Sequence, residues 1–354
     1  MKQINILDLF SGIGGFSLAA QRAGFEINKH YFSEIDKYAE SIYRKQFPDA
    51  IRLGDITKIG NDLEKIDIIT GRFPCQAFSI AGKRRGFEDT RGTLFFEIER
   101  LARFYRPKYM VLENVKGLFS HEKGNTIRII LDKLRGLDYT IQLLLLNTKD
   151  FGIPQNRERL FFICNLRGQF RPEISDIRSR KTEIDEKRNG KSFHAGCIST
   201  KNASGQCNFD GGSTLFAIPV KNNKGKLEKT DNAICIDSNY YKGIDNHGQR
   251  TCILLSDSGQ GRKRELRNIS PPLRAHDGCG HDNYTFENSI IRRLTPIECE
   301  RLQDYPDNWT KYGKADNSIK VPISDTQRYK CCGNSITVKV AEEIFKSIYK
   351  VLIN

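Results

Sequence analysis

The sequence predicts an α/β protein, in which a parallel sheet with helices on both faces is joined to a smaller, irregular and mostly β domain. The first 170 residues alternate short apolar runs, such as INILDLF near the start and YMVL at 109–112, with amphipathic segments. Strands that alternate with helices in this way form parallel sheets. Between about 171 and 290 the chain is rich in Gly, Asn and Ser and keeps only short apolar pieces such as TCILL. We therefore expect the irregular, mostly β domain there.

The expected elements follow from apolar runs for strands and from helical spacing of apolar residues for helices. We expect strands at 4–9, 29–34, 66–70, 109–112, 140–146 and 160–165, and helices at 14–23, 37–46, 94–105 and 126–134. Regular α/β character returns at 292–302, with a helix that starts at Thr295–Pro296, because proline favours the first helical position. A last helix is expected at 337–352. We therefore divide the chain into 1–170, 171–290 and a returning segment, 291–354.

Charge and cysteine content restrict the partners of this protein. Lys and Arg total 57 against 43 for Asp and Glu, which gives a net charge of +14. Such an excess attracts polyanions, of which nucleic acid is the commonest. No stretch approaches the ~18 consecutive apolar residues of a membrane span, so we expect no membrane partner. The ten cysteines form no C-x-x-C pair and are irregularly spaced, which argues against a structural zinc site and against a disulfide framework. We therefore expect a reduced, cytoplasmic protein with no metal.

A glycine turn follows the first expected strand, in DLFSGIGGFS at 8–17. Glycine at such a turn lets the backbone approach a ligand at the start of the next helix, as in dinucleotide-binding turns. Glu34 lies about 20 residues further on, where such sites place an acid that binds ribose. Asp55, in GDIT, ends the next short strand. The glycine turn, Glu34 and Asp55 each follow an expected strand, and together they predict a site for an adenosyl ligand. Taken alone, Glu34 or Asp55 would also fit an ordinary solvent-exposed residue at a strand end.

A second candidate site is the cysteine corner in ITGRFPCQAFSIAGKRRGFEDTRG, 69–92. Cys75 follows an apolar strand, so it is expected at the same carboxyl edge of the sheet as the glycine turn. A thiolate is a strong nucleophile, and nearby cations favour it. The segment 83–91 carries four basic residues between glycines, which suits a loop that closes over a polyanion. Taken alone, an isolated cysteine at such a corner is more often simply buried.

Two further motifs place charged side chains near the same edge. ENV, 113–115, follows the apolar strand YMVL and supplies a carboxylate. QNRER, 155–159, precedes the apolar run LFFICNL. Its two arginines are two residues apart and share a face if the chain is extended. Guanidinium groups bind phosphate or carbonyl oxygens, and each of these arginines would also fit a surface ion pair.

Eight motifs in a fixed order together resemble those of the DNA (cytosine-5) methyltransferases. They are DLFSGIGGFS, SEID, GDIT, FPCQAFSIAGKRRGFEDTRG, ENV, QNRER, RRLTPIECERLQDYP (292–306) and GNSITVKVAEEI (333–344). The resemblance implies a Rossmann-like, S-adenosylmethionine-dependent methyltransferase sheet. It assigns 1–170 as the catalytic and cofactor-binding domain and 171–290 as the variable target recognition domain. The segment 291–354 would return to the catalytic domain.

The resemblance also implies a role for each matching residue. Cys75 would attack C6 of a cytosine flipped out of the duplex, so that C5 can accept a methyl group from S-adenosylmethionine. Glu113 would contact N3 and the exocyclic amine, Arg157 would hold O2, and Arg159 would lie close by. The residues implied in cofactor binding are Phe10, Ile13, Gly14, Glu34, Ile35, Asp55, Ile56, Pro74, Leu94 and Asn334.

DNA contacts are implied for a mobile loop and for a recognition loop. The loop at 79–92 would approach the DNA backbone through Ser79, Lys83 and Arg91, and Gln260 in SGQG would fill the space that the flipped base leaves. The implied partner is double-stranded DNA, bound by a monomer, with a cognate restriction endonuclease as a functional rather than physical partner. Arg72 departs from the family pattern, which usually has glycine there. The family's Thr-Leu pair has its nearest match at Pro272–Leu273.

Three other functions compete with this one. An RNA (tRNA) cytosine-5 methyltransferase would share the scaffold, but the insertion of about 120 residues favours duplex DNA. A non-catalytic DNA-binding regulator would follow if Arg72 disabled the cofactor pocket. An NAD-dependent oxidoreductase fits the glycine turn but leaves Cys75, Glu113 and QNRER unexplained.

Overall fold

The computed structural model describes residues 2–74, 94–172, 294–315 and 319–353 in full. It also describes the backbone of the strands at 207–209, 213–223, 226–229, 233–234, 251–257 and 289–293.

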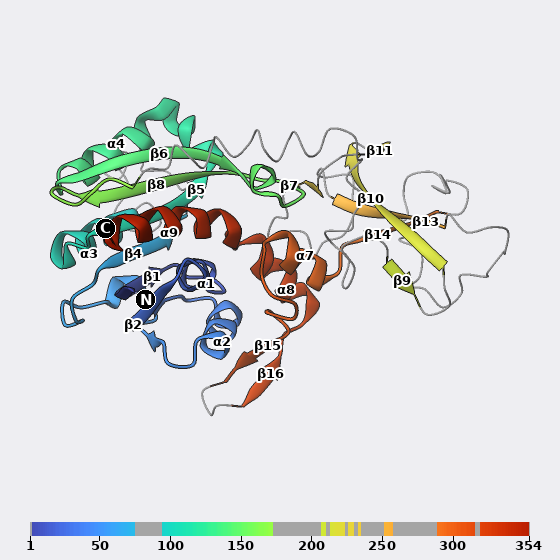
Figure 1. Cartoon of the computed structure of the whole chain (residues 1–354), viewed down its shortest axis with the longest axis horizontal. Coiled ribbons are helices and arrows are strands. Elements are labelled where there is room, and N and C mark those ends of the chain that lie inside the picture. Colours follow the sequence, from blue (N-terminus) through green and yellow to red (C-terminus); the bar gives the residue numbers. More distant parts are fainter. Residues whose placement is uncertain are drawn as a thin grey trace, which may run out of the picture.

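A seven-stranded sheet in the order β3-β2-β1-β4-β5-β8-β6 lies in the left part of the molecule in Figure 1. Its strands are β1 (Lys2–Leu9), β2 (Phe25–Ser33), β3 (Ile51–Arg52), β4 (Ile68–Arg72), β5 (Tyr109–Val115), β6 (Tyr139–Asn147) and β8 (Glu158–Leu166). The first five in this order pair in parallel, as predicted.

The expectation of an entirely parallel sheet is wrong at β8. This strand pairs antiparallel with both β5 and β6. The reason is the short connection between β6 and β8, which holds only the single turn η6 (Thr148–Phe151) and the two-residue strand β7 (Gln155–Asn156). A parallel neighbour needs a crossover of a dozen or more residues, usually through a helix, whereas a short connection returns antiparallel.

Helices cover both faces of the sheet, as predicted. β1 shows why, because its side chains alternate: Ile4 and Ile6 pack in one hydrophobic cluster, and Leu7 and Leu9 pack in the other. The first cluster contains side chains of α1 (Gly15–Arg22), α2 (Lys37–Gln46) and α9 (Val338–Ile353), and the second contains those of α3 (Leu94–Tyr105) and α4 (Asn125–Arg135). The last helix, α9, lies against α1 (Figure 1), so the chain end returns to its beginning.

Two short helices, α7 (Pro296–Leu302) and α8 (Asp325–Gly333), precede α9 in the chain. α7 begins where the sequence predicts: the Thr295 side chain accepts from the Glu298 backbone and the Glu298 carboxylate accepts from the Thr295 backbone, with Pro296 in the first turn. A small hairpin of β15 (Tyr312–Lys314) and β16 (Lys320–Pro322) lies between them in the chain.

A second, antiparallel sheet lies apart from the first, to the right in Figure 1. Its strands are β9 (Cys207–Phe209), β10 (Ser213–Asn223), β11 (Lys226–Lys229), β13 (Thr251–Asp257) and β14 (Ser289–Arg293). The short strand β12 (Ala233–Ile234) pairs in parallel with β7. The division of the chain at 170 and 290 stays a prediction. Within the part of the chain that the structure describes, no helix has the length and apolar character to cross a membrane.

Candidate active site

A cavity of about 350 Å³ lies at the carboxyl ends of the parallel strands. This is the edge at which open α/β sheets bind their ligands. Eight of the residues that the sequence assigns to a cofactor line it: Phe10, Glu34, Ile35, Asp55, Ile56, Pro74, Leu94 and Asn334. The other lining residues are Ser33, Arg72, Phe73, Asn114 and Val115.

Glu34 ties the glycine turn to the end of β2. Its Oε2 accepts from the backbone N–H of Gly12 at 2.8 Å, and its Oε1 accepts from those of Ile35 and Asp36, also at 2.8 Å. Burial raises the pKa of Glu34, and these three backbone N–H groups oppose that effect. Gly12 has a φ of 55°, in the left-handed region that glycine adopts at no steric cost. The turn and the carboxylate are therefore held as one unit.

Asp55 and Ile35 complete this end of the cavity. Asp55 caps the turn η1 (Ile56–Lys58), and its Oδ1 accepts from Thr57 N at 3.0 Å and from Thr57 Oγ1 at 2.9 Å. These hydrogen bonds lower the pKa of Asp55, so it stays ionised at neutral pH. Ile35 is 78% exposed although it is a large apolar residue. An exposed apolar side chain beside two carboxylates suits a ring that has a flat apolar face and polar N–H or O–H groups at its edge.

Two of the predicted cofactor residues, Ile13 and Gly14, are absent from the described lining of the cavity. Ile13 is buried in the core, and its carbonyl accepts from Trp309 Nε1 at 2.9 Å. Gly14 has a φ of 88° and caps the start of α1, and a Cβ there would collide with the Phe47 ring. Both residues therefore contribute to the packing and conformation of the glycine turn.

A row of three charged side chains crosses the sheet next to the cavity. Glu113, at the end of β5, is completely buried. Its Oε2 lies 3.1 Å from Nε of Arg72 on β4, and its Oε1 lies 3.0 Å from Nε of Arg159 on β8. Arg72 and Glu113 are partners in the β4–β5 register, so their side chains leave the same face of the sheet. The structure thus brings together two of the predicted catalytic residues, Glu113 and Arg159, and adds Arg72.

Arg157, the other arginine of QNRER, has different contacts from Arg159. It is 1% exposed, and its Nη2 donates to the carbonyls of Gly333, at 3.3 Å, and Ser335. Its neighbour Gln155 donates to the Leu302 carbonyl at 2.6 Å. The QNRER segment therefore joins the sheet to the returning C-terminal segment, a structural role that sequence reasoning did not assign to it.

Five of the predicted site residues lie outside the described residues: Cys75, Ser79, Lys83, Arg91 and Gln260. Pro74, which directly precedes Cys75 in the chain, lines the cavity. The structure describes no cluster of His, Cys, Asp or Glu that could hold a metal ion within the ranges given above.

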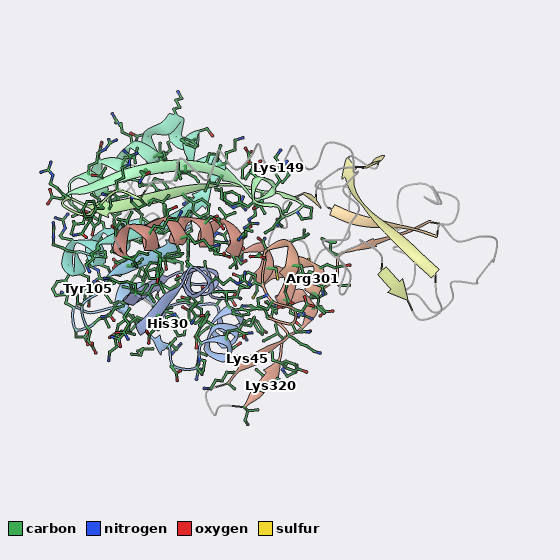
Figure 2. The ribbon with its side chains drawn as sticks, viewed as in Figure 1. His30, Lys45, Tyr105, Lys149, Arg301 and Lys320 are labelled. Atoms are coloured by element: carbon green, nitrogen blue, oxygen red, sulfur yellow. The ribbon has the colours of Figure 1, made fainter. Side chains whose placement is uncertain are left out.

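A buried polar network that the sequence analysis missed lies behind the glycine turn. The Asp8 carboxylate accepts from Thr70 Oγ1 at 2.7 Å, from Ser17 Oγ at 3.0 Å and from Tyr43 OH at 3.1 Å. Nε2 of His30, which Figure 2 labels, lies 2.9 Å from Ser17 Oγ and 2.7 Å from Tyr43 OH. Burial raises the pKa of Asp8 to about 7 and lowers that of His30 to about 4. The two groups are therefore both uncharged between these values.

Other residues that sequence reasoning missed are the remaining lining residues of the cavity. Asn114 belongs to the ENV motif, and its Nδ2 donates to the Phe73 carbonyl at 3.0 Å, which fixes the end of β4 beside β5. Arg72 carried a signal, because it departs from the expected glycine. Ser33 and Phe73 had no signal except their position next to predicted residues.

An open, mostly parallel sheet with a cavity at the carboxyl ends of its parallel strands, flanked by carboxylates, is typical of enzymes that bind a nucleoside-containing cofactor. Residues 4–350 match the model of the family described as C-5 cytosine-specific DNA methylase. The chain belongs to this family, which is one of S-adenosylmethionine-dependent methyltransferases acting on DNA. It is thus a DNA cytosine-C5 methyltransferase, and the predicted family, fold class and enzyme activity are confirmed.

Two relatives support this assignment, and one solved structure supports the fold. The chain is 36% identical to the Type II methyltransferase M1.ScrFI of Lactococcus lactis subsp. cremoris, over 98% of this chain and 78% of that protein. It is 35% identical to the Type II methyltransferase M.HpaII of Haemophilus parainfluenzae, over 100% of this chain and 91% of that protein. The S. pombe Dnmt2 methyltransferase superimposes with a TM-score of 0.67 over 99% of both chains, at 18% identity, which supports the fold.

Proposed function

We propose that this chain transfers a methyl group from S-adenosylmethionine to C5 of a flipped-out cytosine within a specific sequence of double-stranded DNA. The reaction would pass through a covalent bond between Cys75 and C6 of the base. The observation that carries this proposal is the buried Glu113, which lies between two guanidinium groups beside the cavity that Pro74 lines. A carboxylate held in this way beside the cavity suits recognition of a heterocyclic base.

The residues around the cavity fit S-adenosylmethionine. Glu34 and Asp55 offer carboxylate oxygens to the ribose hydroxyls and the adenine amino group, and Ile35 offers an apolar surface to the adenine ring. Asn334 reaches the same cavity from the returning C-terminal segment. The bound cofactor supplies an electrophilic methyl group. The chain's contribution is to orient it at the end of the cavity next to β5.

The base chemistry is assigned to Cys75 and Glu113. Cytosine C5 is a poor nucleophile while the ring is aromatic, and addition of the Cys75 sulfur at C6 removes that aromaticity. Glu113 holds a proton at N3 and accepts from the exocyclic amine, so that negative charge does not accumulate on the ring. Loss of the C5 proton and cleavage of the S–C6 bond then restore the thiolate. Arg159 positions the Glu113 carboxylate through its ion pair.

Recognition of DNA is assigned to the segments outside the central sheet. We assign 171–290 to target recognition, with Gln260 filling the space of the flipped base and Ser79, Lys83 and Arg91 contacting the backbone. Flipping costs a few kcal/mol of unpairing and unstacking, which these contacts offset. Arg157 holds O2 of the base in this proposal, and it must then rearrange from its contacts with 333 and 335. The relatives named Type II methyltransferases support a modification enzyme of a restriction-modification system. In this proposal it acts as a monomer on cytoplasmic, nucleoid DNA, with an endonuclease as a functional partner.

A covalent trap tests the proposal. The protein is incubated with S-adenosylmethionine and a duplex that contains 5-fluorocytosine in its target, because fluorine at C5 blocks the final elimination. We expect an adduct that survives denaturing electrophoresis and that is absent with Cys75→Ser. Cys164→Ala, which alters a buried cysteine of β8, serves as the matched control and keeps the adduct. Bisulfite sequencing of plasmid DNA from expressing cells identifies the target duplex. Methyl transfer to tRNA but not to any duplex, or an adduct with Cys75→Ser, would reject the proposal.

A further inference from the structure

Arg72 is the one cation among the described residues that line the cavity, which also include the two acids Glu34 and Asp55. It ends β4, and its side chain is 23% exposed. Arg72 therefore brings to the cavity a positive charge and hydrogen-bond donors that the two carboxylates cannot provide.

The strand order separates the charges of the cavity into two ends. Glu34 follows β2 and Asp55 follows β3, at one side of β1, whereas Arg72 ends β4 on the other side and neighbours β5. Carboxylates accept hydrogen bonds from hydroxyl and amino groups, and a guanidinium donates to anions. The cavity is therefore complementary to a ligand with uncharged N–H and O–H groups at one end and a carboxylate at the other.

The row of charged side chains formed by Arg72, Glu113 and Arg159 contains more basic than acidic groups. Arg72 and Arg159 together carry two positive charges, and Glu113 between them carries one negative charge. The Glu113 carboxylate engages Arg72 at Nε. A guanidinium has two further NH₂ groups, so Arg72 keeps donors for a second acceptor while it stays paired with Glu113.

We propose that Arg72 binds the carboxylate of the cofactor's amino-acid part and thereby links the cofactor site to Glu113. This inference rests on the proposed function, because it takes the cofactor to be S-adenosylmethionine. In that molecule the sulfur that carries the methyl group lies between the adenosyl and amino-acid parts. In the proposed function the adenosyl part lies at Glu34 and Asp55, and the methyl group lies near Glu113. The amino-acid part then lies at the Arg72 end of the cavity.

Binding of two ligands that differ in the amino-acid part tests this role. S-adenosylhomocysteine keeps the carboxylate, and 5′-methylthioadenosine has the same adenosyl sulfur but lacks the amino-acid part. Isothermal titration calorimetry measures both dissociation constants for the wild type and for Arg72→Gln. A hydrogen bond between charged partners corresponds to roughly ten- to hundredfold in affinity. We expect Arg72→Gln to weaken the binding of S-adenosylhomocysteine by that factor and to leave the dissociation constant of 5′-methylthioadenosine unchanged. The unchanged value also shows that the variant is folded.

Two further variants sharpen the test. Arg103→Gln removes an equivalent charge from an exposed arginine of α3, which pairs with Glu99, and is expected to bind both ligands like the wild type. Glu113→Gln keeps Arg72 and is expected to keep the preference for the ligand with the carboxylate. Equal weakening of the binding of both ligands by Arg72→Gln would overturn the role of Arg72 while leaving the cofactor site intact. If the wild type bound neither ligand, that result would contradict both the proposed function and this inference.

Discussion

Nε of Arg159 lies 3.0 Å from Oε1 of Glu113, and the direction of β8 makes this contact possible. Arg159 is the second residue of β8, and in the antiparallel register it pairs with Val115 at the carboxyl end of β5. A parallel β8 would place its first residues at the opposite edge of the sheet. The reversed strand therefore brings a guanidinium to the edge where the cavity and Glu113 lie.

Replacing Glu113 by Gln should abolish most of the activity without loss of cofactor affinity. The side chain keeps its shape but no longer accepts from the base amine as a charged group or exchanges a proton at N3. We expect kcat to fall by about 10²- to 10⁴-fold, the usual contribution of a positioned acid–base group. Single-turnover transfer of radiolabelled methyl groups measures this. Glu64→Gln, an exposed residue that pairs with Lys29, is the control. Activity of Glu113→Gln close to that of the wild type would contradict the role.

Replacing Glu34 by Gln should weaken cofactor binding. The carboxylate of Glu34 accepts from three backbone N–H groups and faces the cavity, and Gln offers one uncharged acceptor in place of two oxygens. We expect roughly ten- to hundredfold weaker binding of S-adenosylhomocysteine in calorimetry. The exposed Glu26, on the strand β2 that Glu34 follows, gives the matched control Glu26→Gln. Unchanged affinity in Glu34→Gln would show that the ligand binds elsewhere.

Asp8→Asn should change how stability depends on pH. Burial raises the folded-state pKa of Asp8 from 3.8 to about 7, so the unfolded chain loses this proton first as the pH rises. Asp8 therefore stabilises the fold below about pH 4, and this contribution is lost as the pH rises to about 7. Over that range the variant should gain stability relative to the wild type, by on the order of 4 kcal/mol.

Urea unfolding of both proteins across this pH range measures the difference. His30 titrates in both proteins, so its contribution largely cancels in the comparison. A difference in the free energy of unfolding that stays constant with pH would show that Asp8 is ionised in the fold throughout.

Arg328→Met should destabilise the returning segment. The Glu300 carboxylate of α7 is completely buried, and its Oε1 accepts from Thr310 N at 2.9 Å and from Arg328 Nη2 at 3.0 Å. Removing the cation leaves a buried charge without its ion-pair partner, which costs about 3–5 kcal/mol. Urea unfolding is the measurement, and Arg135→Met, at an exposed arginine of α4, is the control. Equal stability of the two variants would mean that Glu300 does not depend on Arg328.

Local patterns predicted the elements and much of the cavity lining. α2 at 37–46 and α3 at 94–105 lie where the apolar spacing predicts them, because both helices bury one apolar face. The residues at the ends of β2 and β4 also lie where expected, because strand ends are marked by acids, Gly or Pro in the sequence. Ile13 and Gly14 are not among the residues that line the described cavity, since a motif does not reveal which of its residues face a cavity.

The sequence by itself determined the family and the main strands and helices of the first 170 residues, and it predicts the groups that carry the chemistry, because these depend on residue type and spacing along the chain. Only the tertiary structure decided that β8 runs antiparallel, that Arg72 and Arg159 both meet Glu113, and that Arg157 holds the C-terminal segment. Those contacts join residues from separate strands and from opposite ends of the chain. Which residues meet depends on the register of the strands and on the pairing of buried charged groups. Neither can be read from a local sequence pattern.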